Sequence, residues 1–227
     1  MKESITIGIP SKGRLKDKSI SFFNDSGLKI LQSKKERNYF GTIENRSNIK
    51  VIFLHAKEII QRLADETLDL GISGLDLLKE SDKNLQKKIN IQKKLNFGNA
   101  NLVIAVPDEW IDVQNVADLE EISFDIRLKR NSRLRIATKY PNLTNNFLLS
   151  KGITQYKLIS SLGATETYPF IGSSEIITDI SSSGKTLKDN NLRILNDGLI
   201  LESTACLFFS KKKFFSNNKL FKSLDVF

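Results

Sequence analysis

The chain has 227 residues, 40% of them apolar and 27% charged, which is the composition of a soluble globular protein with one large domain or two small ones. Its formal net charge of +9 favours an anionic partner, but no aromatic-interleaved basic stripe or nucleic-acid module accompanies that charge. The sequence contains no run of about 18 apolar residues, so we expect no membrane-spanning helix.

The predicted elements alternate between strands and helices. Strands are predicted at residues 4–9, 39–43, 49–54, 68–72, 102–106, 134–138, 156–159, 176–180, 192–195 and 199–209. Helices are predicted at residues 15–25, 56–66, 113–130 (with a break) and 143–150, and shorter ones begin near residues 73, 163 and 185. This alternation is typical of mainly parallel α/β sheets.

The first strand leads into a loop with two cations, Lys12 and Arg14, on either side of Gly13. Ser11 is the expected N-cap of the helix that follows. Cations at a helix N-terminus are slightly unfavourable against the helix dipole. That local cost favours a polyphosphate-binding role over that of two ordinary surface cations.

A second strand-to-helix turn is formed by Ser73, Gly74, Leu75 and Asp76. Ser73 and Asp76 have the spacing of a capping box. A capping box would explain both residues structurally, so a ligand role here depends on the other loops.

The third such turn lies within EIITDISSSGKTL, residues 175–187. An apolar strand leads into three serines and a glycine, and Lys185 starts a predicted helix. Hydroxyls and backbone N–H groups at such a turn favour an anion such as a sugar phosphate. Asp179 is placed to hold a sugar hydroxyl or a metal. The alternative is an ordinary Ser/Gly turn.

Ligands of open α/β sheets bind at the carboxyl ends of strands, where all three turns are expected. Three such loops favour a binding site more strongly than any one of them alone.

Two single residues have simpler interpretations. Cys206 is the only cysteine, which excludes an internal disulfide and favours a reducing compartment and a buried apolar role. His55 is the only histidine, and a structural or solvent-facing role is favoured over acid–base catalysis. The N-terminus has no signal-peptide core, so we expect a cytoplasmic protein.

The motifs together resemble the short form of the ATP phosphoribosyltransferase (HisG) family. The resemblance runs nearly end to end and is most specific in ATKYPNLT and in the DISSSGKTL loop. The motifs are IPSKGRL at 9–15, ERNY at 36–39, DLGISGLDLL at 69–78, FGNANLVIAVPDEWIDV at 97–113, ATKYPNLT at 137–144, SLGATE at 161–166 and DISSSGKTL at 179–187.

The resemblance implies two α/β domains of the periplasmic-binding-protein type (type II-like) with an active-site cleft between them. Domain I would be residues 1–95 plus 192–227, and domain II, residues 96–191, would carry the phosphate loop. It also implies the reaction, in which N1 of ATP attacks C1 of 5-phosphoribosyl 1-diphosphate (PRPP) and releases pyrophosphate. This is the first step of histidine biosynthesis. Mg²⁺ is the implied cofactor, bound through substrate phosphates and without assigned protein ligands.

The resemblance also assigns residues to the substrates. The 5-phosphate of PRPP is expected to contact the loop residues Ser181, Ser182, Ser183, Gly184, Lys185 and Thr186. Glu166 and Asp179 are expected at the ribose hydroxyls. Pyrophosphate or the ATP phosphates are expected to contact Lys12, Gly13, Arg14 and Arg37, of which Lys12, Arg14 and Arg37 are the candidate catalytic residues. The nucleotide side is expected to be lined by Ser73, Gly74 and Asp76.

Two departures from the family pattern matter. The sequence ends at Phe227, without the C-terminal domain through which long-form relatives bind histidine. The resemblance therefore implies a separate regulatory subunit (HisZ), similar to histidyl-tRNA synthetase, in a hetero-oligomer with a homodimer of catalytic subunits. Phe40 stands where close relatives often carry a second basic residue after ERxY, so only Arg37 is assigned there.

Two other functions compete with this interpretation. A solute-binding module of the same fold would hold an anion without chemistry, but a single small solute does not require Lys12, Arg14 and a phosphate loop together. A nucleic-acid binder would rest on the net charge alone. We expect neither nucleic acid nor a membrane as a partner.

Overall fold

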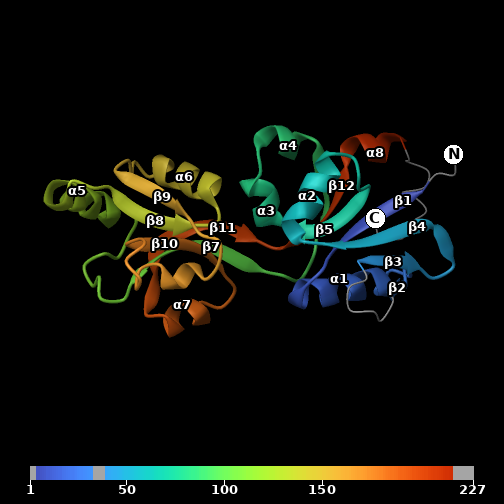
Figure 1. The fold of residues 1–227 in the computed structure, drawn as a ribbon, viewed down its shortest axis with the longest axis horizontal. Coiled ribbons are helices and arrows are strands. Elements are labelled where there is room, and N and C mark those ends of the chain that lie inside the picture. Colours follow the sequence, from blue (N-terminus) through green and yellow to red (C-terminus); the bar gives the residue numbers. More distant parts are fainter. Residues whose placement is uncertain (1–3, 33–38, 217–227) are drawn as a thin grey trace. The chain divides into compact units, whose positions relative to one another are not determined.

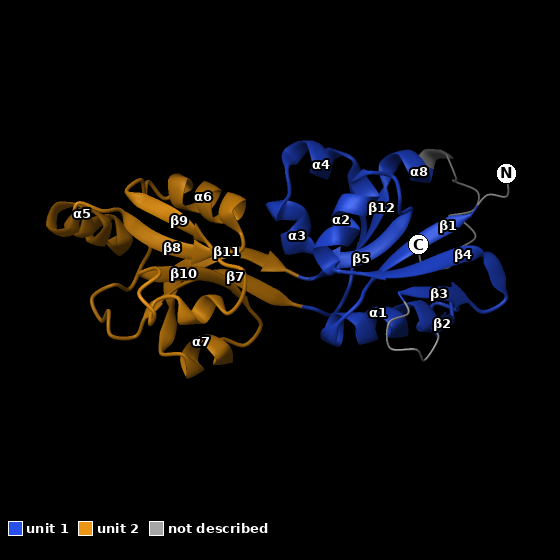
Figure 2. Ribbon diagram, in the orientation of Figure 1, with its two compact units in different colours: residues 1–98, 204–227 blue, residues 99–203 orange. Residues whose placement is uncertain are grey.

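The computed structural model describes residues 4–32 and 39–216. The chain forms two compact units, residues 1–98 with 204–227 (unit 1) and residues 99–203 (unit 2), as Figure 2 shows. The boundaries expected from the sequence were 95/96 and 191/192. The second observed boundary falls later because the strand at residues 192–203 pairs along its length with a strand of unit 2.

Unit 1 is built on one mixed sheet, labelled in Figure 1. Its elements are β1 (Ile5–Pro10), α1 (Gly13–Asp25), β2 (Ile30–Gln32), β3 (Phe40–Ile43), β4 (Arg46–Leu54), α2 (Ala56–Ala64), β5 (Leu70–Gly74), α3 (Leu75–Glu80), α4 (Lys83–Lys87), β6 (Ile89–Lys94), β12 (Ala205–Ser210) and α8 (Lys211–Ser216). The strand order is β2-β3-β4-β1-β5-β12-β6. Strand β1 runs parallel to β4 and β5, whereas β12 is antiparallel to β5 and β6.

The core of unit 1 follows the alternation of its strands. Ile5, Ile7 and Ile9 of β1 are fully buried and pack in one cluster with Phe23 of α1. The opposite face of the sheet packs against α2, whose Ile59 lies in a second cluster. Because successive side chains of a strand point to opposite faces, α1 and α2 cover opposite sides of the sheet.

Unit 2 is built on a second mixed sheet. Its elements are β7 (Ala100–Pro107), α5 (Asp118–Arg130), β8 (Leu134–Thr138), α6 (Pro141–Ser150), β9 (Tyr156–Ser160), the 3₁₀ turn η1 (Thr165–Thr167), β10 (Ile176–Ser181), α7 (Lys185–Asp189) and β11 (Leu192–Ser203). The strand order is β11-β7-β10-β8-β9. Strand β8 is parallel to both β9 and β10, and β7 is antiparallel to β10 and β11.

The parallel pairing of β8, β9 and β10 has a direct consequence for function. The carboxyl ends of these three strands meet at one edge of the sheet, where the chain enters α6, η1 and α7 (Figure 1). Ligand sites of α/β proteins form at such an edge.

Several predictions of local structure were wrong. The sheets are mixed rather than mainly parallel, because β2, β3, β6, β7, β11 and β12 all make antiparallel pairs. The break predicted between residues 195 and 199 lies instead at Thr204, and the segment at 195–199 is a register shift within β11. The short elements β2, α4, β6 and α8 were not predicted, because they are too short to show a clear hydrophobic periodicity.

Two predicted helix caps were also wrong. The N-cap of α1 is Lys12 rather than Ser11, and it makes no side-chain cap bond. The N-cap of α3 is Gly74, and Ser73 instead belongs to β5, where its hydroxyl donates to the Ala56 carbonyl at 2.7 Å. Tertiary hydrogen bonding thus replaces the capping box. Among the described residues, no helix is long and apolar enough to cross a membrane.

Candidate functional site

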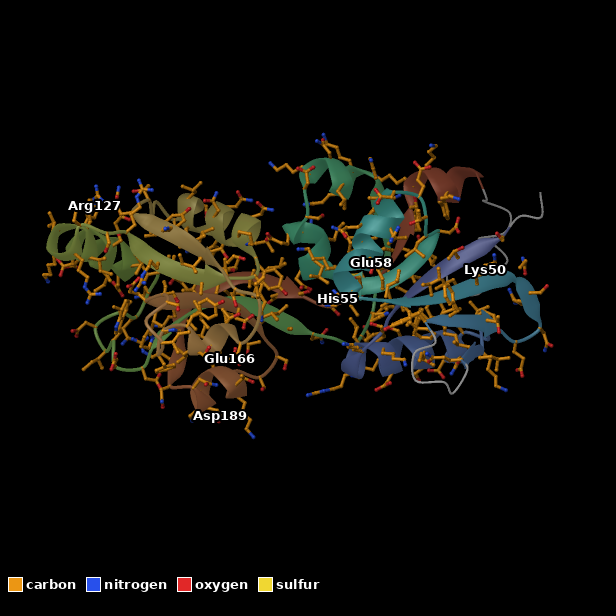
Figure 3. All side chains as sticks on the ribbon, in the orientation of Figure 1. Lys50, His55, Glu58, Arg127, Glu166 and Asp189 are labelled. Atoms are coloured by element: carbon orange, nitrogen blue, oxygen red, sulfur yellow. The ribbon has the colours of Figure 1, made fainter. Side chains whose placement is uncertain are left out.

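A pocket of about 270 Å³ lies at the edge where β8, β9 and β10 end. Its lining residues come from three segments that are distant in the sequence. They are Lys139 after β8, Glu166 in η1, Asp179, Ile180 and Ser181 in β10, Ser182 and Ser183 in the loop, and Thr186 and Leu187 in α7. Figure 3 labels Glu166 in the same part of unit 2 as α7.

The loop between β10 and α7 is shaped by its own serines. Gly184 has φ of +72°, a left-handed conformation that glycine adopts readily, and it precedes the first residue of α7. Its N–H donates to the Ser181 hydroxyl at 2.9 Å, and the Lys185 N–H donates to the Ser183 hydroxyl at 3.4 Å. The serine hydroxyls therefore hold the loop in a tight turn at the start of α7, the kind of Ser/Gly turn that can bind an anion.

Buried threonines fix the strands behind the pocket. The Thr178 hydroxyl of β10 lies 2.6 Å from that of Thr138 and 2.7 Å from that of Thr144. All three side chains are buried. Hydroxyls that satisfy one another in the interior make separation of β8, β10 and α6 costly, because each would be left without a partner.

Asp179 is the most perturbed acid of the pocket. Burial raises its pKa, and the Glu166 carboxylate raises it further. The Ile180 N–H, which donates to Oδ1 at 2.8 Å, the Lys139 ammonium and the Thr165 hydroxyl all oppose that rise. A carboxylate whose pKa is raised by burial indicates a functional site, because a ligand that donates hydrogen bonds to its charged form would stabilise it.

The structure brings together most of the predicted PRPP residues. Glu166, Asp179, Ser181, Ser182, Ser183 and Thr186 line the pocket. Gly184 and Lys185 line an adjoining hollow of about 520 Å³ that shares Ser183. Lys139 also lines the pocket and was missed by the sequence-based assignment. The signal for it was its position directly after a predicted strand, within ATKYPNLT.

The predicted residues of unit 1 fall in two places. Lys12, Gly13 and Arg14 are exposed at the start of α1, whose first turn contains no acidic residue. Ser73 and Asp76 are buried around Gly74 at the start of α3. Arg37 lies outside the described residues.

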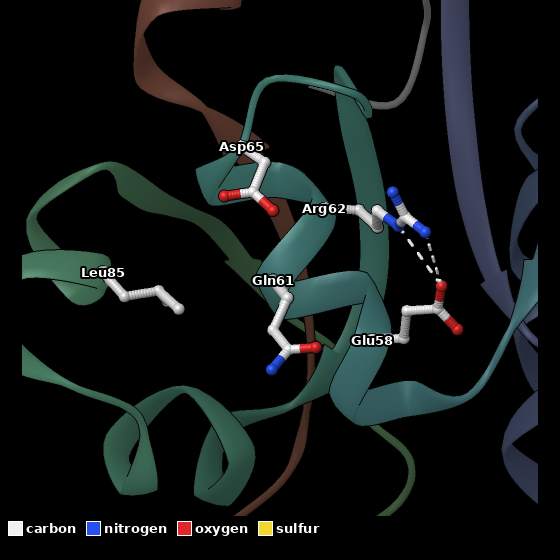
Figure 4. A pocket seen from close by; sticks show the side chains of 5 residues that line it. All are labelled: Glu58, Gln61, Arg62, Asp65 and Leu85. Carbon is white, nitrogen blue, oxygen red and sulfur yellow. Dashed lines mark hydrogen bonds and ion pairs between the residues drawn. The ribbon is translucent and has the colours of Figure 1, made fainter.

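Unit 1 also carries a hollow of about 560 Å³ between α2 and α4, shown in Figure 4. It is lined by Glu58, Gln61, Arg62, Asp65 and Leu85. Arg62 is the only cation of this lining, and it is paired with Glu58 at 3.2 Å. The hollow therefore offers less to a phosphate than the pocket of unit 2.

Cys206 and His55 have local roles. Cys206 is buried in β12, and burial raises the pKa of its thiol to about 11, so it is not a thiolate nucleophile at neutral pH. His55 is the N-cap of α2, and its ring accepts a hydrogen bond from the Lys57 N–H.

Comparison with known proteins gives the family. The family model for HisG, ATP phosphoribosyltransferase, matches residues 55–225. An ATP phosphoribosyltransferase of Nitrobacter winogradskyi is 43% identical over 217 residues, covering 96% of this chain and 67% of that protein. The chain belongs to the ATP phosphoribosyltransferase family. A second ATP phosphoribosyltransferase, from a Chelativorans species, is 44% identical over 211 residues. The match covers 92% of this chain and 92% of that protein.

The fold agrees with that of this family. The ATP phosphoribosyl transferase (HisG:HisZ) complex from Thermotoga maritima matches with a TM-score of 0.73 and 24% identity, covering 98% of this chain and 96% of that one. The substrate-binding protein of an amino acid ABC transporter matches with a TM-score of 0.55 and 15% identity. The two α/β units thus have the type II periplasmic-binding-protein fold expected from the sequence.

As an ATP phosphoribosyltransferase, the chain is a pentosyltransferase. It condenses ATP with PRPP to phosphoribosyl-ATP and pyrophosphate in the first step of histidine biosynthesis. The solute-binding alternative is not favoured, because relatives above 40% identity are enzymes whereas the transporter protein shares only the fold.

We predict that Asp179→Asn stabilises the protein at neutral pH. The raised pKa of Asp179 means that folding favours its protonated form, so its contribution to stability declines as the pH rises through the folded-state pKa. Asparagine keeps the oxygen acceptor and removes the partly buried charge. The melting temperature of the variant should exceed that of the parent at pH 7, and the difference should shrink as the pH falls toward 4.

Asp189→Asn, which removes an exposed charge on α7, serves as the matched control and should show no such pH-dependent gain. A lower melting temperature for Asp179→Asn at pH 7 would contradict the assignment of a burial cost to this carboxylate.

Proposed function

We propose that the loop between β10 and α7 binds the 5-phosphate of PRPP. The observation that carries this proposal is the convergence of the loop with Lys139, Glu166 and Asp179 on one pocket of sugar-phosphate size. Ser181, Ser182, Ser183, Gly184, Lys185 and Thr186 supply hydroxyls, backbone N–H groups and one ammonium group. These are donors for a phosphate dianion.

The ribose of PRPP would lie against the two carboxylates. Asp179 and Glu166 line the same pocket, and the Glu166 carboxylate raises the pKa of Asp179. Carboxylates accept hydrogen bonds from vicinal hydroxyls, and a bond to an ionised acceptor is about twice as strong as a neutral one. We propose that this contact orients C1 of the ribose for attack.

The phosphates of ATP or the departing pyrophosphate would contact Lys12, Gly13 and Arg14. These residues are exposed at the start of α1, a 13-residue helix without acidic groups in its first turn. Arg37 has the same proposed role. Ser73, Gly74 and Asp76 remain proposed for the nucleotide side, with the Ser73 hydroxyl already bonded within unit 1.

The chemistry requires positioning and charge neutralisation. The adenine N1 lone pair forms the new bond to C1 while the bond from C1 to the pyrophosphate oxygen breaks. Positive charge then develops on the ribose and negative charge on the leaving group. Lys12, Arg14 and Arg37 would stabilise that leaving group, and no protein nucleophile is needed.

Mg²⁺ is the cofactor proposed for the reaction. Across residues 4–32 and 39–216, no three His, Cys, Asp or Glu side chains form a cluster that would hold a metal. Mg²⁺ characteristically keeps several waters and binds through substrate phosphates. An ion held by PRPP and ATP would therefore need no cluster of protein ligands. When bound in this way, it neutralises charge on the pyrophosphate.

We propose a regulatory partner and a cytoplasmic location. The solved relative from Thermotoga maritima is a complex of HisG with HisZ, and this supports a HisZ-type subunit for the present chain. A homodimer of catalytic subunits remains a prediction of the family resemblance. The cytoplasm is the compartment that supplies ATP for the reaction.

The reaction is tested by incubating the chain with ATP, PRPP and Mg²⁺, with and without a HisZ-type subunit. We expect phosphoribosyl-ATP to form in a PRPP-dependent manner, with the subunit increasing the rate. Absence of product under both conditions would refute catalysis, whereas product at equal rates would refute only the dependence on the subunit.

Gly184→Val should weaken PRPP binding. Valine at a φ of +72° costs roughly 1–2 kcal/mol of backbone strain and would open the loop, so the Kd for PRPP measured by calorimetry should rise about tenfold or more. Gly152→Val imposes similar strain at φ of +82° beyond α6, outside the residues that line the pocket, and should leave PRPP affinity intact. Equal PRPP affinity in Gly184→Val and the parent would remove this loop from the site.

A further inference from the structure

Lys139 occupies a defined position beside Asp179. Strands β8 and β10 are parallel, with Thr138 opposite Thr178 in the register. Lys139 directly follows Thr138 and Asp179 directly follows Thr178, and both line the same pocket. Side chains at neighbouring positions of adjacent strands are close enough to interact.

The backbone around Lys139 is fixed even though its side chain is exposed. The N–H of Tyr140 donates to the Thr138 hydroxyl at 2.9 Å, and the N–H of Thr144 donates to the Tyr140 carbonyl at 3.0 Å. Thr138 is in turn bonded to Thr178. Lys139 thus projects from a segment that is attached to the same strand as Asp179.

The charges around Asp179 come from two segments. Glu166 of η1 raises the pKa of Asp179, and Lys139 after β8 lowers it. Other cations of the neighbouring elements do not line this pocket: Arg135, at the amino end of β8, is bonded to Glu175 at 2.6 Å, and Lys185 and Lys188 of α7 line the adjoining hollow. Strand β7, the other neighbour of β10, carries no charged residue. Lys139 is therefore the cation of this pocket that opposes the rise in the pKa of Asp179.

We propose that Lys139 is a positioning residue of the reaction, whose ammonium group keeps Asp179 ionised in the free enzyme and so ready to accept hydrogen bonds from the ribose of PRPP. This inference rests on the proposed function of the pocket. In this role Lys139 acts through Asp179 and does not need to contact the reacting atoms. Without Lys139, only the Ile180 N–H and the Thr165 hydroxyl would oppose the effects of burial and Glu166 on Asp179. A larger share of Asp179 would then be protonated, and PRPP binding would first have to displace that proton.

The test compares Lys139→Gln, Lys139→Arg and Lys157→Gln with the parent. Lys157 is an exposed lysine on β9 that lines no pocket described here, so its substitution controls for the loss of one charge. Two quantities are measured across pH 5 to 9: the carboxyl ¹³C shift of Asp179, assigned with Asp179→Asn, and the Kd for PRPP. Because the phosphates of PRPP titrate identically in every sample, only differences between variants are interpreted.

In Lys139→Gln, we expect the titration of Asp179 and the acid limb of PRPP binding to move together to higher pH. PRPP affinity should approach the parent value at the alkaline end. Lys139→Arg should restore both midpoints, and Lys157→Gln should move neither. An unchanged midpoint of the Asp179 titration in Lys139→Gln would overturn the inference. A loss of PRPP affinity that is equal at every pH would also overturn it, because that result indicates direct contact between Lys139 and a phosphate.

Failure of the proposed function gives a different result. If Asp179→Asn binds PRPP as tightly as the parent at every pH, the carboxylate does not hold the ribose, and the role of Lys139 in substrate binding is overturned with it. If Asp179→Asn loses affinity while Lys139→Gln matches the parent throughout, only the role of Lys139 is overturned.

Discussion

The parallel pairing of β8 with both β9 and β10 determines where the chemistry of unit 2 lies. Parallel strands deliver their carboxyl ends to one edge of the sheet, and each of these three strands is followed by a segment that lines the pocket. Lys139, Glu166 and the serine loop are therefore adjacent in space although up to about 45 residues separate them in sequence. Strands β7 and β11, which are antiparallel to their neighbours, complete the sheet on the other side of β10 without lining the pocket.

Side-chain hydrogen bonds also fix the strands on which the pocket is built. The hydroxyls of Thr138, Thr144 and Thr178 satisfy one another beneath the pocket, and Arg135 binds Glu175 at the opposite, amino ends of β8 and β10. These interactions hold the strands in place while Asp179 carries a partly buried carboxylate whose pKa is raised by that burial. An enzyme that binds a sugar phosphate gains from this arrangement, because the cost is relieved when the ligand supplies hydrogen bonds.

The sequence predicted the parts of the site that are local in the chain. EIITDISSSGKTL has the strand, turn and helix in consecutive order, so the loop and Asp179 could be assigned by pattern. Lys139 was missed although it directly follows a predicted strand, because its place beside Asp179 depends on the register between β8 and β10, which a local pattern does not give. Ser73 shows the opposite error. Its spacing to Asp76 suggested a helix cap, but β5 lies inside the sheet and the hydroxyl is bonded to Ala56. The break between β11 and β12 was misplaced for a similar reason: Thr204 is held by carbonyls of Leu95 and Phe97.

The central claim is that PRPP binds in the pocket at the carboxyl ends of β8, β9 and β10. It is tested most directly by following the backbone amide resonances of the ¹⁵N-labelled chain as ribose 5-phosphate, the phosphosugar part of PRPP, is added. The account predicts the largest shifts at residues 181–186, with smaller ones at Lys139, Glu166 and Asp179. Saturating shifts confined to other residues, with these amides unchanged, would contradict it.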